Sequence, residues 1–132
     1  MDARETNALA LAYLGDAVYE LEVRKYLLNQ GLTKVKELHQ TAIKLVKATT
    51  QANAIHRMLP QLNEEEVGIV KRGRNAKSGT TPKHTEVIDY RYATAFESLI
   101  GFWYMNGNMT RIAWAFDIAR AVVEEREATA LT

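Results

Sequence analysis

The first long apolar stretch, residues 6–29, most constrains the fold. On a helical wheel at about 100° per residue, its apolar side chains fall on two sides. One side carries Leu11, Leu14, Val18 and Leu21, and the other carries Leu9, Ala12, Tyr13, Val23 and Leu27. A helix that is apolar on both sides belongs in the middle of a helical protein. Asp16 falls in the second set, so we expect it at a helix–helix or subunit seam rather than on an open, solvated face.

The rest of the chain also carries helical signals, and no segment shows sustained strand alternation. The expected helices cover residues 6–29, 33–59 with a break near 49–51, 63–73, 85–105 and 108–127. Asn63 and Glu66 have the spacing of a capping box, and Gly31 and Gly107 follow helix ends. The stretch from Asn75 to His84 is expected to be an exposed loop. The sequence therefore predicts an all-α fold, with residues 1–132 as one domain.

Composition narrows the class of protein. The 132 residues include no cysteine, so disulfides and thiolate metal sites are excluded. No apolar run approaches the roughly 20 residues of a membrane span, and the N-terminus lacks the order of a signal peptide. We therefore expect a cytoplasmic protein. Its net charge of +1 is too small to indicate a polyanionic partner by itself.

One local segment is strongly basic. Residues 71–84 hold five lysines or arginines and no acid. Phosphate contacts are one interpretation, and the candidate RNA-binding residues are Arg72, Arg74, Asn75, Lys77 and Lys83. A solvated connection between helices is the alternative.

A second lone acid, Glu97, lies in the apolar segment from Tyr90 to Tyr104. Its neighbours on the wheel include small residues, which leave room for another helix, a metal or a substrate. Two such carboxylates, Asp16 and Glu97, suggest a site for a hard divalent cation such as Mg²⁺. The alternative is that each acid pairs with an arginine such as Arg24, Arg57 or Arg91. Glu20, one turn after Asp16, is interpreted as a partly solvated side chain.

Two motifs resemble those of the ribonuclease III family. L-A-Y-L-G-D-A-V-Y-E resembles the family signature, and A-T-A-F-E-S-L-I-G-F-W-Y resembles its second acidic motif. R-G-R-N-A-K resembles a feature of the short branch, Mini-ribonuclease III, which consists of a catalytic domain alone. The resemblance implies an endoribonuclease that cleaves double-stranded RNA and leaves 5′-phosphate and 3′-hydroxyl ends. Asp16 and Glu97 would be its catalytic and metal-binding residues, with Mg²⁺ as cofactor and Mn²⁺ as a substitute.

The resemblance also implies partners. These are a second copy of the chain, the stem of precursor 23S ribosomal RNA and a large-subunit ribosomal protein as helper. The chain departs from the classical motifs at Ala12 and Thr94, where other members carry acids, so the number of metals is open. Two alternatives to an enzyme follow: a non-catalytic RNA-binding or ribosome-assembly module on the same fold, and a helical interaction protein whose acids are structural.

Overall fold

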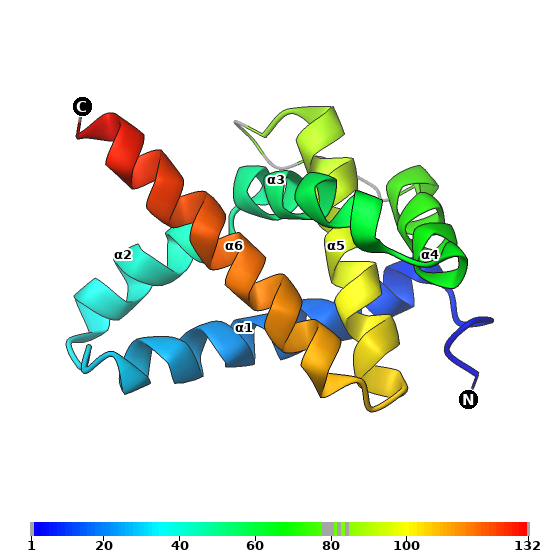
Figure 1. The fold of residues 1–132 in the computed structure, drawn as a ribbon, viewed down its shortest axis with the longest axis horizontal. Coiled ribbons are helices and arrows are strands. Elements are labelled where there is room, and N and C mark those ends of the chain that lie inside the picture. The colour runs from blue at the N-terminus through cyan, green and yellow to red at the C-terminus, as the bar shows by residue number, and fades with distance from the viewer. Residues whose placement is uncertain (1, 78–80, 82, 84, 132) are drawn as a thin grey trace.

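Helices make up most of the computed structural model, which describes all residues except 1, 78–80, 82, 84 and 132. They are α1 (Ala8–Asn29), α2 (Val35–Val46), α3 (Ala48–Met58), α4 (Glu64–Asn75), α5 (Val87–Met105) and α6 (Met109–Ala130), with a 3₁₀ turn, η1, at Leu59–Gln61 (Figure 1). The described residues contain no strand. The all-α prediction is therefore confirmed.

Most predicted helix ends lie within a few residues of the observed ones. Asn63 accepts from the backbone N of Glu66, and the Glu66 side chain accepts from that of Asn63, which confirms the capping box. Gly31 and Gly107 have φ values of 88° and 71°, which glycine adopts without strain. The break in the second helix comes at Lys47 rather than near residues 49–51.

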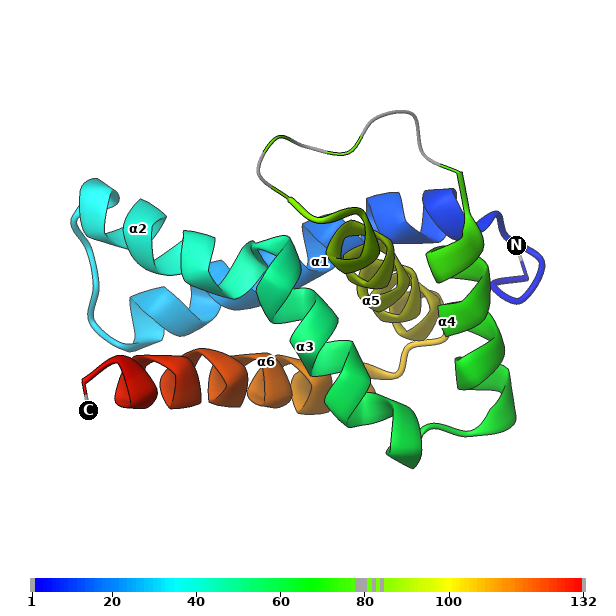
Figure 2. The same cartoon turned by 90° about the horizontal axis from the view of Figure 1, so that it is seen from above.

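The central helix is α5, not α1. Figure 2 shows α5 nearly end-on, with α1, α3 and α4 around it. Its buried residues include the aromatic side chains Phe96, Phe102 and Trp103. One face of α1 packs on this core through Leu11 and Val18.

A different face of α1, which takes Tyr13 and Leu21 from separate sides of the wheel, is open, so Asp16 does not lie at a helix–helix seam within the chain; a subunit seam stays a prediction. The Tyr13 side chain is 86% exposed and Leu21 58% exposed, and Asp16 is also exposed in the chain. The wheel records which residues share a face, but not whether a partner within the chain covers that face.

A buried carboxylate joins α4 to α5 and α6. Glu66 is 4% exposed, and it accepts from Trp103 Nε1 at 2.8 Å and from Arg111 at 2.7 Å. The Arg111 guanidinium also lies 4.3 Å from the centre of the Trp114 ring. Because the buried charge has both an ionic partner and hydrogen bonds, the arrangement avoids the cost of an isolated charge. No helix in the described part of the chain has the length and hydropathy needed to cross a membrane.

Candidate active site

The site is built where α1 and α5 cross with their backbones in contact. A Cβ atom on Gly15 would lie 1.8 Å from the carbonyl oxygen of Glu97, and one on Gly101 would lie 2.0 Å from that of Leu11. Any side chain at either position would force the helices apart, because real contacts are far longer. The two glycines therefore bring the backbone beside Asp16 against the backbone of Glu97. Helix α1 therefore fills the space that the small residues beside Glu97 leave on α5.

Two carboxyl groups meet at this crossing. Asp16 is exposed, while Glu97 is partly buried. Burial and then the negative charge of Asp16 raise the pKa of Glu97 from 4.5 to about 9. In this state protonated Glu97 hydrogen-bonds to Asp16, and Glu20 adds a smaller repulsion of the same sign. The crossing thus places two carboxyl groups side by side, and their mutual repulsion favours the protonated form of Glu97.

The arginine alternative fails for the candidates named from the sequence. Arg24 pairs with Glu20 at 3.2 Å, and Arg57 pairs with Glu125 at 2.6 Å. No ion pair involving Asp16, Glu97 or Arg91 occurs among the described residues. Glu20 is half-exposed, as predicted, but it is also close enough to act on Glu97.

Sequence reasoning missed a third polar group at the site. Gln51, on α3, is 2% exposed, and its side chain hydrogen-bonds to Glu97. This contact opposes the rise in the pKa of Glu97. A polar residue among apolar neighbours on α3 was the available signal, but the residue that it contacts lies 46 positions further along the chain.

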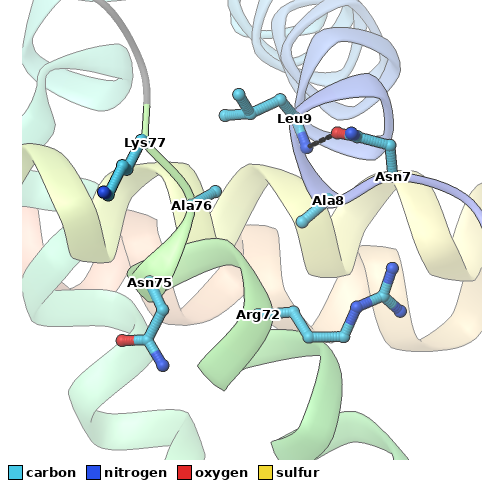
Figure 3. Close-up of a pocket in the computed structure, with 7 residues that line it drawn as sticks. All are labelled: Asn7, Ala8, Leu9, Arg72, Asn75, Ala76 and Lys77. Carbon is cyan, nitrogen blue, oxygen red and sulfur yellow. Dashed lines mark hydrogen bonds between the residues drawn. The ribbon is translucent and has the colours of Figure 1, made fainter.

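The basic segment begins at the end of α4, beside the start of α1. A pocket of about 420 Å³ there is lined by Asn7, Ala8, Leu9, Arg72, Asn75, Ala76 and Lys77. Figure 3 shows Arg72 and Lys77 pointing away from each other, and Asn7 turned toward the backbone N of Leu9. The cations therefore do not converge on one point in this pocket.

The predicted RNA-binding residues have different environments. Arg72 donates to the carbonyl oxygens of Arg4, at 2.7 Å, and Thr6, so it fastens the N-terminal segment. Arg74 donates to Asn75 at 3.1 Å. Lys77 and Lys83 are exposed. The predicted loop from Asn75 to His84 lies partly outside the described residues, which exclude 78–80, 82 and 84.

Comparison with known proteins decides the family. The Ribonuclease III domain model matches residues 9–108. A Mini-ribonuclease 3 from Desulfitobacterium hafniense is 53% identical over 94% of this chain and 78% of that protein. One from Brevibacillus brevis is 50% identical over 93% of this chain and 92% of its own length. A crystal structure of a protein from Fusobacterium nucleatum aligns with a TM-score of 0.82 at 35% identity, covering 91% of this chain and 96% of that one.

The chain belongs to the ribonuclease III family. Its curated relatives are named Mini-ribonuclease 3, and the resemblance stated from the two motifs is confirmed. It is an endoribonuclease that acts on double-stranded RNA.

This ribonuclease III site is sparse in acids. Ala12 is 7% exposed and Thr94 is 8% exposed, and the Thr94 hydroxyl donates to the Tyr90 carbonyl at 3.0 Å. Both positions thus contribute to packing. Among the described residues no group of three or more histidine, aspartate or glutamate side chains has an arrangement that would hold a metal. Two carboxylates with an amide nearby still suit Mg²⁺, which takes oxygen ligands and keeps several waters.

Proposed function

We propose that Asp16 and Glu97 bind Mg²⁺ and form the catalytic centre of this endoribonuclease. The observation that carries the proposal is the pair of carboxyl groups at the α1–α5 crossing, where burial and then the negative charge of Asp16 raise the pKa of Glu97. A divalent cation between them would relieve that repulsion. Mn²⁺ offers the same charge and accepts the same oxygen ligands, so it is the expected substitute.

The two acids have different parts in this site. Bound Mg²⁺ supplies an activated water and stabilises the charge that develops at phosphorus. Exposed Asp16 is open to the RNA backbone, whereas the packing of α3 and α5 restricts water around Glu97. Glu97 must lose its proton to become a ligand. The expected products carry 5′-phosphate and 3′-hydroxyl ends.

We further propose that the basic segment contacts the RNA backbone. Exposed Lys77 and Lys83 are free to reach phosphates, with Arg74 and Asn75 beside them. Arg72 contributes positive charge, but its hydrogen bonds to the N-terminal segment give it a structural part as well. A-form RNA is recognised mainly by shape and backbone contacts, so binding should weaken as salt rises.

A second copy of the chain is the proposed partner of the open face of α1. Tyr13 and Leu21, at positions i and i+8, together with Ala17 between them, form an exposed apolar stripe beside Asp16. Pairing through this stripe would bury it and place two sites on one RNA duplex. Classical members of the family pair two catalytic domains so that two sites lie along one RNA duplex.

The proposed substrate is the stem that joins the ends of precursor 23S ribosomal RNA in the cytoplasm, with a large-subunit ribosomal protein as helper. Residues 1–132 would act as one catalytic domain, which the family match over residues 9–108 supports. Incubation with that precursor, with and without the ribosomal protein, should yield defined ends and faster cleavage when the protein is present. Indiscriminate cleavage that the helper does not alter would contradict this substrate.

The test of the site is the variant Asp16→Asn. We expect wild-type protein to cut a long RNA duplex with Mg²⁺ and to stop when the cation is chelated. The variant should bind RNA but leave it intact, and its metal-free melting temperature should not fall, because the repulsion on Glu97 is removed. Full activity of the variant would refute the role of Asp16, and a lower melting temperature would favour structural acids. Duplex binding by the wild type without scission would favour the non-catalytic module.

A further inference from the structure

Gln51 is an unusual residue for its place in α3. The buried residues that follow it on this helix are apolar, namely Ala52, Ala54, Ile55 and Met58. Gln51 is as buried as these neighbours, at 2% exposure. A buried amide is costly unless it has a hydrogen-bond partner, so an apolar side chain would serve packing better at this position.

The partner of Gln51 is a residue of the proposed catalytic pair. Its side chain hydrogen-bonds to the carboxyl group of Glu97 on α5, against which α3 packs. An amide N–H that donates to one carboxylate oxygen restricts rotation of the carboxylate. Glu97 is thereby held between Gln51 on one element and Asp16 on another.

The backbone that carries Gln51 is itself held in place. The preceding residue, Thr50, is fully buried, and its hydroxyl donates to the carbonyl of Lys44 at 2.6 Å. Arg126 of α6 donates to the same hydroxyl oxygen at 3.3 Å. These contacts join the ends of α2 and α3 to α6. The amide of Gln51 therefore extends toward α5 from a backbone segment that these contacts hold in place.

We propose that Gln51 is a positioning residue that holds the Glu97 carboxylate in the orientation needed to bind a divalent cation together with Asp16. This inference rests on the proposed function of the two acids. Gln51 orients the ligand and does not itself touch the reacting phosphate. Removing the amide should then weaken cation binding while leaving the fold and RNA binding nearly unchanged.

The experiment compares Gln51→Met with Asn53→Met. Methionine has nearly the length and volume of glutamine, so the first variant removes the amide but keeps the packing. Asn53 is exposed on the same helix, so the second variant is a matched control. The first measurement is the melting temperature across a series of Mg²⁺ concentrations without RNA. The second is the Mg²⁺ concentration for half-maximal cleavage, together with the KM for duplex RNA.

For Gln51→Met we expect the Mg²⁺ midpoint to rise about 10- to 100-fold in both measurements, the effect typical of losing a group that orients a metal ligand. Its metal-free melting temperature and its KM for RNA should stay close to those of the wild type, and Asn53→Met should match the wild type throughout. Gln51→Asn, whose shorter amide falls short of Glu97, should show the same shift and provides a second variant if the first does not fold.

The inference is overturned if the wild type responds to Mg²⁺ and cuts RNA but Gln51→Met has an unchanged metal midpoint. A lower melting temperature with an unchanged midpoint would reduce Gln51 to a packing role and would equally overturn it. Failure of the wild type to bind Mg²⁺ or cut RNA would instead overturn the proposed function, and the inference with it.

Discussion

At the scale of single residues, the two acids of the candidate pair have different environments. Asp16 was expected at a helix–helix or subunit seam, and within the chain it is exposed, so only the subunit seam stays a prediction; Glu97 is partly buried. Isolation among apolar residues singled out both positions as candidate site residues. It did not reveal which one is buried, because burial depends on elements that are distant in sequence. The raised pKa of Glu97 follows from that burial and from the nearby charge of Asp16.

The pKa of Glu97 predicts how metal-free stability depends on pH. A carboxyl group whose pKa is raised from 4.5 to about 9 gives folding a contribution that is fully present below pH 4.5. That contribution is lost as the pH rises through about 9, because the unfolded chain releases the proton first. The melting temperature without metal should therefore fall over this range more steeply in the wild type than in Glu97→Gln.

Calorimetry of the two proteins in buffers of matched ionic strength checks this prediction. Added Mg²⁺ should restore the melting temperature of the wild type at high pH, since the cation binds deprotonated Glu97. Parallel pH profiles of the wild type and Glu97→Gln would contradict the assigned pKa.

At the scale of the elements, helix identity followed from local signals, whereas helix contacts did not. The Asn63–Glu66 capping box and the glycines after α1 and α5 appear in the structure as predicted. The break between α2 and α3 comes at Lys47, earlier in the chain than expected. The Thr50 hydroxyl donates to the Lys44 carbonyl across this break. Glu66 has a second role, because its carboxylate also accepts hydrogen bonds from Trp103 and Arg111. No local sequence pattern indicated these contacts.

The α1–α5 crossing yields a prediction at this scale. Gly15→Ala should lower stability and abolish cleavage, because its Cβ would occupy the place of the Glu97 carbonyl and push the two acids apart. Overpacking of this kind costs about 1–3 kcal/mol or more. Thermal melts and the duplex-cleavage assay measure both effects.

Gly68→Ala is the matched control for the crossing. A Cβ on Gly68, within α4, would meet nothing within 4 Å, so this change should be neutral or stabilise the helix by up to about 1 kcal/mol. Equal effects of the two substitutions would show that helix contact at Gly15 is not what matters.

At the scale of the whole molecule, the open face of α1 gives the proposed second copy a place to bind. Replacing Leu21 by Glu would place a charge within the exposed apolar stripe. We expect this variant to be monomeric and much less active while keeping its helical content. Analytical ultracentrifugation and circular dichroism, with the cleavage assay, test the three expectations.

The control for this surface is Ile43→Glu on α2. Ile43 and Leu21 are each 58% exposed, so the two substitutions add the same charge to equally open apolar sites on different helices. Ile43→Glu should leave the dimer intact. Loss of the dimer in both variants, or in neither, would count against the α1 stripe as the interface.

The sequence alone determined the helical class, most helix ends and the family, because these depend on local periodicity, capping residues and two short motifs. It also singled out Asp16 and Glu97 as a candidate pair. Only the tertiary structure decided that their helices cross at Gly15 and Gly101, that Gln51 contacts Glu97, and that Arg72 fastens the N-terminal segment. These facts concern residues far apart in the chain, and such contacts are set by how whole helices pack rather than by any local pattern.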